Sequence, residues 1–493
     1  MSVLVVDVGT TGLRAAVVRP DTTIVGFTYE PLPPSSPIVG LVEFDGIAMR
    51  DAVLRVAHAA LAAGGPVRAV GVTAQRASTI VWDSRTGTPV APGLGWQDLR
   101  TVGECMRWKS ERGLVFAPNQ TATKLEWLRK NVEAARSPHA RAGTVDTWVA
   151  AVLSNFGVHA TDSSNAAVTG LADHASLSNH SWSTTVLDAL DIDPGTLPKI
   201  VPTIGVVGEA SALPGAPPIA ALVGDQQSSL VGQGGIVAGA AKATFGTGGM
   251  LDVYAGTSTP KHLARTTNGT FPIVVYSQGN TLHWGSEAIM LTAGSNVEWL
   301  VNDLGILPDA KSSDALAASV ESSDGVVYVP ALIGMGTPHW DYGARGTLLG
   351  VTRGTTRAHV VRAVLEGIAH RGADLLEATE LDTGLHVKRL RVDGGMSRNH
   401  VFTQALADAT GRPVEICRDT EATTLGAAFL AGVAVGVWGS LAEATALVSP
   451  LRVVQPRRGT DGDTPQSPVS RAQWHEAVRR ARGWIPELSA LDF

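Results

Sequence analysis

The feature that most constrains the fold is a theme that recurs along the chain: a short apolar run leads directly into a polar, glycine-containing turn. It occurs at residues 3–12, 219–227, 243–249 and 389–395. Short apolar runs that end in turn residues predict buried strands, and glycine allows a backbone to approach a ligand closely. We therefore expect a fold of buried strands whose polar groups gather where the strands end.

Helical segments alternate with these strands. Apolar residues at helical spacing predict a helix over residues 48–63, and residues 359–378 have the same spacing with few helix breakers. Further strands are predicted at residues 13–18, 67–72 and 79–82. Such alternation favours α/β layers. Because the strand–turn theme returns in the second half, we expect two α/β lobes with an interdomain cleft, divided near residues 225–240.

The length of the chain also favours several units. Its 493 residues are too many for one compact core, and 44% of them are hydrophobic. We expect an N-terminal lobe, a C-terminal lobe and a terminal segment, over residues 1–235, 236–445 and 446–493. In the terminal segment, an exposed loop is predicted at residues 455–470 and an amphipathic helix at 472–484. That helix would place Trp474, Val478 and Ala481 on one face.

Composition excludes several classes of protein. A formal net charge of -6 and a pI near 6.1 argue against a dedicated binder of nucleic acid or of anionic membranes. The only cysteines, Cys105 and Cys417, lie far apart, which suits a reducing compartment without a disulfide framework. No secretory leader and no apolar run of about 20 residues stands in the sequence. We expect a cytoplasmic protein.

Phosphate binding is the chemistry that the turns suggest. Phosphoryl transfer needs positioning and charge neutralisation, which backbone N–H groups in glycine-rich turns provide. After the first strand, Asp7 could hold a magnesium ion through water, and Arg14 adds positive charge. Thr10, Thr11 and Gly12 could surround a phosphate. The alternative is an ordinary hairpin, but two similar turns, Gly246-Thr247-Gly248-Gly249 and Asp393-Gly394-Gly395, favour an anion site.

Asp225 is the candidate general base. It follows an apolar run directly and precedes Gln226 and Gln227, which could orient a polyol. A carboxylate there could accept the proton of a hydroxyl as its oxygen attacks a phosphate. The alternative is that Asp225 caps the following helix. The residues alone leave both interpretations open.

Taken together, the motifs resemble those of the FGGY carbohydrate kinases, and among them the glycerol kinases most closely. The resemblance covers the chain from residue 3 to about residue 440. Its most specific part is a long pattern over residues 346–367. The residues that carry it are Gly346-Thr347-Leu348-Leu349-Gly350-Val351, Ala363-Val364-Leu365-Glu366-Gly367, Lys124-Leu125-Glu126-Trp127-Leu128, Val145-Asp146-Thr147-Trp148 and Gln75-Arg76.

The resemblance implies a two-lobed, actin-like (ribonuclease-H-like) ATPase fold that closes over ATP, Mg²⁺ and a substrate. It implies ATP-dependent phosphorylation of a hydroxyl of a small polyol or sugar. By resemblance, the nucleotide is bound by Thr10, Thr11, Gly12, Arg14, Thr247, Gly294, Gly395 and Asn399. The residues at substrate positions are Arg76, Trp96, Asp225 and Gln226, with Asp225 as general base.

Four positions depart from the glycerol kinase pattern. Ala77 stands where those enzymes carry a glutamate, and Asn119 where they carry a tyrosine. Leu291 replaces an aromatic residue, and Glu298 stands at a nucleotide position that is usually glutamine. Losing a carboxylate that binds hydroxyls removes charge-assisted hydrogen bonds of about 1.5–3 kcal/mol each. The departures therefore favour a substrate larger than glycerol, such as a tetritol, pentitol or pentulose like xylulose, or weak use of glycerol.

Two other classes remain as alternatives. One is a non-catalytic, actin-like ATP-binding regulator, against which the presence of Asp7, Thr10, Asp225 and Thr247 argues. The other is a carbohydrate-binding module, which would need no phosphate-binding turns. Members of the resembled family are often dimers or tetramers, so a homodimer or homotetramer is expected by analogy.

Overall fold

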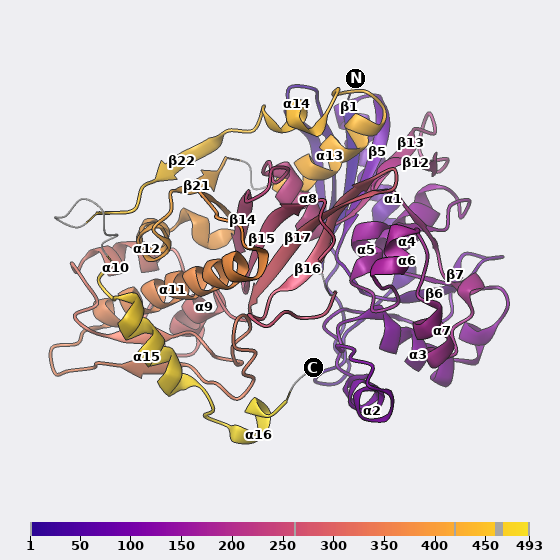
Figure 1. The fold of residues 1–493 in the computed structure, drawn as a ribbon. Coiled ribbons are helices and arrows are strands. Elements are labelled where there is room, and N and C mark those ends of the chain that lie inside the picture. Colours follow the sequence, from indigo (N-terminus) through magenta and orange to yellow (C-terminus); the bar gives the residue numbers. More distant parts are fainter. Residues whose placement is uncertain (1, 261–262, 419–420, 459–466, 492–493) are drawn as a thin grey trace.

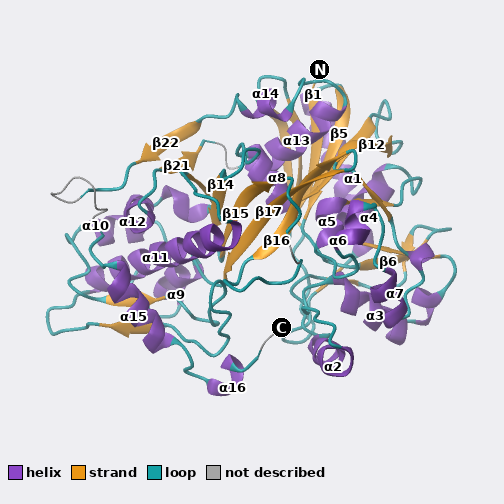
Figure 2. Ribbon diagram, in the orientation of Figure 1, coloured by secondary structure: helices purple, strands orange, loops and turns teal. Residues whose placement is uncertain are grey.

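The computed structural model describes residues 2–260, 263–418, 421–458 and 467–491. A thirteen-stranded sheet runs through the molecule, with helices packed beside it (Figures 1 and 2). The strand order is β22-β21-β20-β14-β15-β17-β16-β12-β13-β5-β1-β2-β3. The two-lobed α/β architecture predicted from the sequence is confirmed.

The first lobe contributes six strands to this sheet. Their bounds are β1 (Ser2–Val8), β2 (Gly12–Val18), β3 (Ile24–Pro31), β5 (Val67–Ala74), β12 (Ile204–Glu209) and β13 (Pro218–Gly224). β1, β5 and β13 are parallel, so their carboxyl ends meet at one edge. β2 follows β1 as an antiparallel hairpin and pairs with β3. The turns after β1 and β13 therefore lie at the same edge of the sheet.

The second lobe contributes the other seven strands. These are β14 (Ala241–Phe245), β15 (Gly249–Gly256), β16 (Phe271–Gln278), β17 (Thr281–Met290), β20 (Leu390–Asp393), β21 (Val414–Cys417) and β22 (Pro450–Val454). β14, β20 and β21 are parallel to one another. The two halves of the sheet join where β12 pairs with β16, through Ile204 and Gln278.

Helices and small sheets complete each lobe. Those of the first lobe are α1 (Gly46–Gly64), α2 (Val102–Arg112), α3 (Thr121–Asn131), α4 (Val145–Leu153), α5 (Ser163–Ala167), α6 (His174–Ser178), α7 (Thr184–Leu190) and α8 (Asp225–Gly232), with β4 (Glu43–Phe44), β6 (Ile80–Asp83), β7 (Thr88–Pro89), β8 (Gly93–Leu94), β9 (Ala140–Gly143), β10 (Ala160–Asp162) and β11 (Lys199–Val201). Those that follow are α9 (Ser295–Asn302), α10 (Ser312–Ala318), α11 (Arg357–Thr383), α12 (His400–Thr410), α13 (Ala422–Ala434), α14 (Leu441–Thr445), α15 (Arg471–Ala481) and α16 (Pro486–Ser489), with β18 (Val327–Val329) and β19 (Thr347–Leu349).

Helix α13 connects the two halves of the sequence. It comes late in the chain, yet it packs on α8 and on the first-lobe strands β1, β5 and β13 (Figure 1). Val5, Val223 and Phe429 are buried together in one core cluster. Residues from both ends of the chain thus share one core, and α8 lies inside the junction of the lobes. The residue boundaries predicted for the lobes, 235 and 445, stay predictions.

The predicted helices are confirmed with shifted ends. The helix predicted at 359–378 is part of the longer α11, and the terminal helix ends at Ala481 because Arg482 has an extended backbone. Trp474, Val478 and Ala481 are buried as predicted. In the predicted loop at 455–470, residues 455–458 and 467–470 lie outside helices and strands, although Val469 is buried; residues 459–466 lie outside the described part of the chain. No described helix is long and apolar enough to cross a membrane.

Candidate functional site

The turn after β1 is built around a buried ion pair. Asp7 and Arg14 are cross-strand partners of β1 and β2, and Nε of Arg14 donates to Oδ2 of Asp7 over 2.6 Å. Arg14 also lies 3.5 Å from the carboxylate of Glu421, which precedes α13. Oδ1 of Asp7 is buried and has no hydrogen-bond partner among the described residues. Burial raises the pKa of Asp7 to about 6, and Arg14 opposes the rise.

This carboxylate fits the magnesium ion predicted from the sequence. Asp7 keeps one oxygen free of protein hydrogen bonds inside the molecule, where an unpaired polar atom is costly. Hard divalent cations prefer carboxylate oxygens and retain much of their water. A hydrated cation at Oδ1 would satisfy that oxygen and stabilise the charged form of Asp7.

Thr10 and Gly12 shape the same turn. Nε1 of Trp96, which follows β8, donates to Oγ1 of Thr10 over 3.1 Å. A predicted substrate residue thus contacts a predicted phosphate residue. Gly12 lies against β3, where an added Cβ would come 2.8 Å from the carbonyl oxygen of Glu30, so only glycine fits. Thr11 is exposed in the turn.

Asp225 is the first residue of α8, immediately after β13. Gly224 occupies the N-cap position, and Oδ1 of Asp225 accepts the neighbouring N–H of Gln226, over 2.8 Å. The alternative that Asp225 caps the helix is therefore wrong. Nε of Arg76, in the segment that follows β5, lies 3.8 Å from Oδ1 of Asp225. Asp225 and Arg76, far apart in sequence, meet at the edge of the sheet.

Beside Asp225 lies a row of charged side chains. Lys242 on β14 is the cross-strand partner of Asp252 on β15. Asp252 is in turn the cross-strand partner of Glu287 on β17. The row continues to Arg76, whose Nη2 donates to Oε2 of Glu287 over 2.6 Å. We call Lys242, Asp252, Glu287 and Arg76 the charged row. It joins strands of the second lobe to the first lobe directly beside Asp225.

The charges of this row act on the acid–base properties of the site. Burial raises the pKa of Asp225, and the nearby Arg76 and Lys242 only partly oppose this. Burial likewise raises the pKa of Glu287 in spite of Arg76. Nη1 of Arg76 is buried without a hydrogen-bond partner among the described residues. The site therefore combines a carboxylate of raised proton affinity with an unused cationic donor.

The second glycine turn lies between β14 and β15 and contacts the start of α9. The carbonyl of Thr247 accepts the N–H of Ala293 over 2.8 Å, and that of Gly246 accepts the N–H of Gly294 over 2.8 Å. A Cβ on Gly294 would lie 2.6 Å from the carbonyl oxygen of Gly246, which explains the glycine. Glu298 is exposed one turn further along α9.

The third turn follows β20 and contacts α8. Nε2 of Gln233, just after α8, donates to Oδ2 of Asp393 over 2.6 Å. Gly395 is exposed in the turn. The side chain of Asn399 is occupied locally: its Oδ1 caps α12 by accepting the N–H of Phe402, and its Nδ2 donates to Ser313. α8 thus links the Asp225 side of the junction to this turn.

The positions that depart from the resembled pattern lie at different depths. Ala77 is buried and has a left-handed backbone, with φ of 61°, directly after Arg76. Asn119 is exposed, and its carbonyl accepts from Nζ of Lys124, which also lies 3.5 Å from the carbonyl oxygen of Trp96. Burial lowers the pKa of Lys124 to about 7. Asn119 is thereby held near Trp96, whereas Leu291 at the end of β17 is half-buried.

Lys242, Asp252 and Glu287 were not among the predicted site residues. Each is a buried charged residue within a strand of the second lobe. A charge in a buried strand was the available signal, because buried charges need partners. Their partners, however, lie up to 211 positions away in sequence, as Arg76 does from Glu287.

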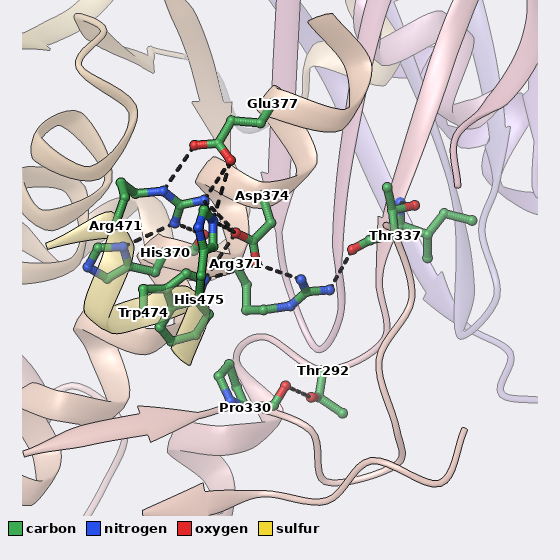
Figure 3. A network of polar contacts seen from close by, with 11 residues as sticks. Thr292, Pro330, Thr337, His370, Arg371, Asp374, Glu377, Arg471, Trp474 and His475 are labelled. Carbon is green, nitrogen blue, oxygen red and sulfur yellow. Dashed lines mark hydrogen bonds and ion pairs between the residues drawn. The ribbon is translucent and has the colours of Figure 1, made fainter. Parts of the chain in front are cut away.

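A second buried charge network anchors α15 to α11 (Figure 3). Asp374 accepts from Nη1 of Arg371, from Nη2 of Arg471 and from Nε1 of Trp474. We call these four residues the C-terminal network. Asp374, Glu377 and His475 lie close enough together to suggest a metal site. Nη2 of Arg471 already lies 2.5 Å from Asp374 and 2.8 Å from Glu377, so a cationic side chain fills that position.

The network also supports a loop of the second lobe. Nη2 of Arg371 donates to the carbonyl of Thr337 over 2.6 Å. The N–H of Thr337 in turn donates to the carbonyl of Ile289, near the end of β17 (Figure 3 shows the Thr337 contact). Hydrogen bonds therefore connect the C-terminal network, through Thr337, to the strand that carries Glu287.

Comparison with known proteins agrees with this architecture. Residues 2–232 match the N-terminal domain, and residues 241–435 the C-terminal domain, of the FGGY family of carbohydrate kinases. The chain therefore belongs to this family, and it is an ATP-dependent kinase with the actin-like fold.

Individual relatives cover almost the whole chain. A glycerol kinase of Bordetella parapertussis is 40% identical over 98% of this chain and 97% of its own length. A glycerol kinase of Gloeobacter violaceus is 37% identical at the same coverage. The crystal structure of Plasmodium falciparum glycerol kinase with ADP superposes with a TM-score of 0.89 at 27% identity, covering 97% of this chain and 98% of that one. A xylulose kinase of Rhodospirillum rubrum, 24% identical and covering 97% of each chain, shares the fold with a TM-score of 0.82.

Proposed function

We propose that this kinase transfers the γ-phosphoryl group of ATP to a primary hydroxyl of glycerol or a similarly small polyol. The observation that carries the proposal is the position of Asp225 at the junction of the lobes, beside Arg76 and at the start of α8. The relatives named glycerol kinase, at 37–40% identity over nearly the full length, support this substrate class.

Asp225 is the proposed general base. Its raised pKa increases its affinity for the proton that the hydroxyl loses as the oxygen attacks the γ-phosphorus. The bond between that phosphorus and the β–γ bridging oxygen breaks, and ADP leaves. Arg76 stabilises the carboxylate from one side and offers Nη1 to a substrate oxygen. Gln226, next to Asp225, is proposed to orient the polyol.

The phosphates are proposed to lie among the three turns. Those of ATP would meet N–H groups and hydroxyls of Thr10, Thr11, Gly12 and Thr247, together with the guanidinium of Arg14. Gly294, Gly395, Asn399 and Glu298 are proposed to border the rest of the nucleotide. Asp7 would hold Mg²⁺ through water, and that ion supplies charge neutralisation at the β- and γ-phosphates when bound. Arg14 orients the Asp7 carboxylate by binding its other oxygen.

A larger acceptor, a tetritol, pentitol or pentulose, is the second candidate. The observation that favours it is Ala77, a small buried side chain directly after Arg76, together with Asn119 near Trp96. Both side chains leave more room than the glutamate and tyrosine of the resembled pattern.

A substrate panel decides between the two candidates. We would measure ADP release with ATP and Mg²⁺ for glycerol, erythritol, ribitol, xylitol, D-xylulose and a hexitol. A kcat/KM highest for glycerol supports the first candidate, and a preference of tenfold or more for a longer acceptor supports the second. Turnover of none of these compounds would contradict the proposed function.

A further inference from the structure

Lys242 is buried at the centre of the charged row, with no exposed surface. Its Nζ donates to Oε1 of Gln226 over 2.7 Å and to Oγ1 of Thr244 over 3.1 Å, and it forms an ion pair with Oδ2 of Asp252 at 2.9 Å. These three oxygens surround the ammonium inside the molecule. Burial alone would lower the pKa of Lys242, but the carboxylates of Asp252 and Asp393 outweigh it, so the ammonium stays charged.

The contact with Gln226 has a directional consequence. An amide has one acceptor oxygen and one donor nitrogen, and a buried ammonium accepts nothing. Lys242 therefore holds the oxygen of Gln226 and makes no use of Nε2 of that amide. In the described part of the chain, no residue accepts a hydrogen bond from this Nε2. Gln226 is half-buried beside Asp225, so its NH₂ group is a donor available to a substrate.

We propose that Lys242, neutralised by Asp252, is a positioning residue that makes Gln226 a hydrogen-bond donor to the acceptor substrate. The inference rests on the proposed function and deepens it. Around the reacting hydroxyl, Gln226 and Arg76 offer donors, and Asp225 is the acceptor of the proton. Such an arrangement selects an oxygen that accepts from the protein while it gives its proton to Asp225, as an alcohol does.

A purely structural role makes a different prediction. A buried ion pair between adjacent strands can often be replaced by apolar residues at little cost in stability. If Lys242 and Asp252 served only the sheet, replacing both would change the melting temperature and leave KM for the polyol unchanged. If Lys242 acts through Gln226, the replacement weakens polyol binding, and the weakening requires Gln226.

The experiment compares three variants with the wild-type enzyme: Lys242→Met with Asp252→Leu, Gln226→Ala, and all three changes together. Replacing both members of the pair avoids leaving an unpaired buried carboxylate. The matched control is Arg362→Met with Glu366→Leu, which removes another buried ion pair (2.8 Å) of the second lobe, on α11. For each, kcat, KM for the best acceptor of the panel and KM for ATP would be measured.

We expect the Lys242–Asp252 replacement to raise the acceptor KM about tenfold, as a lost hydrogen bond does, with KM for ATP changed by less than about twofold. On the Gln226→Ala background, the same replacement should add less than about twofold. An unchanged acceptor KM, or losses that multiply on that background, would overturn the inference. If wild-type enzyme turns over no acceptor, the proposed function itself fails, which is a distinct result.

Gln226→Glu provides a second route that does not depend on removing the buried pair. A glutamate keeps a contact with Lys242 but has no NH₂ donor, so the acceptor KM should rise about tenfold or more. An acceptor KM equal to that of the wild type would show that the donor is not used, and would overturn the inference. Thermal stabilisation by ATP confirms that each variant is folded.

Discussion

The two buried charge networks of this protein differ in how completely they are satisfied. In the C-terminal network, both oxygens of Asp374 accept hydrogen bonds, from Arg371, Arg471 and Trp474. Burial alone would raise the pKa of Asp374, but the two arginines outweigh it and lower the pKa. At the junction of the lobes, burial prevails and the pKa values of Asp7 and Asp225 are raised.

We interpret this difference in pairing as a difference in role. A structural network gains stability by pairing every donor and acceptor, because an unpaired buried polar group costs about 1–3 kcal/mol. At the junction, Oδ1 of Asp7 and Nη1 of Arg76 lack hydrogen-bond partners among the described residues. Unused donors and acceptors at strand ends are the groups that substrates and ions can complete. The following predictions test this contrast.

The largest effect is expected at Asp225. Asp225→Asn keeps the size of the side chain but removes the base, so kcat should fall about 10²–10⁴-fold. ATP should still raise the melting temperature, since Asp225 is not proposed to bind the nucleotide. Asp374→Asn is the matched control from the other network and should retain kcat within about threefold at a temperature where it is folded. Normal turnover by the Asp225 variant would show that the base is assigned wrongly.

The same two substitutions should rank in the opposite order by their effect on stability. Asp374→Asn leaves Arg371 and Arg471 without their buried counter-ion, and should lower the free energy of unfolding by about 3–5 kcal/mol. Asp225→Asn should lower the free energy of unfolding by less than about 1 kcal/mol, or raise it, because burial disfavours the charged carboxylate. Urea unfolding followed by circular dichroism measures both. Equal losses would remove the distinction between the networks.

Asp7 should make stability depend on pH in a recognisable direction. Its pKa is raised from 3.8 to about 6 in the folded state, so the folded protein binds more protons between these values and stability falls as pH rises through them. Above about pH 6, Asp7→Asn should therefore be more stable than the wild type by about 2–3 kcal/mol without divalent cations. Urea unfolding from pH 4 to pH 8 with a chelator tests this. A constant difference across that range would contradict it.

The same variant should lose activity while it gains stability. Asn at position 7 removes the charge that would hold Mg²⁺ and face Arg14. We expect kcat to fall at least about 10²-fold at saturating ATP, because charge neutralisation is a main contribution to phosphoryl transfer. A stabilised and fully active variant would show that the unpaired oxygen of Asp7 has no functional role.

The smallest effect is expected at Glu298. This carboxylate is exposed on α9, close to the turn that contains Thr247, so it would repel the phosphates weakly across solvent. Glu298→Gln should lower KM for ATP about two- to threefold at low salt, with a smaller change at high salt. A higher KM for ATP would indicate that Glu298 contacts the nucleotide directly. Glu321→Gln, elsewhere on the second lobe surface, is a control.

Much of the fold and part of the site could be predicted from local sequence. The strands that end at Val8, Gly224 and Asp393 formed where apolar runs meet glycine turns, because burial and turn chemistry are local properties. The same logic found Asp225 as a functional candidate. It did not exclude that Asp225 is a helix cap, which required the observation that Gly224 holds the cap position.

Other features could not be predicted because they depend on long-range pairing. Local sequence does not distinguish Asp374 from the other polar residues of a long helix, and its partner Arg471 lies 97 positions later. Helix α13 follows second-lobe sequence but packs on first-lobe strands. Hydrophobic periodicity indicates which face of an element is buried, but it does not indicate which element covers that face.

The sequence by itself determined that this chain forms strands ending in polar, glycine-containing turns, and that Asp7, Thr10, Asp225 and Thr247 stand at or beside those turns. Only the tertiary structure decided which charges meet. Lys242, Asp252 and Glu287 became neighbours of Arg76 and Gln226 through the register of three strands and the joining of two lobes. The physical reason is that strand propensity and turn chemistry act over a few residues. A buried charge instead needs a partner within a few ångströms, and only the completed fold decides which residue lies there.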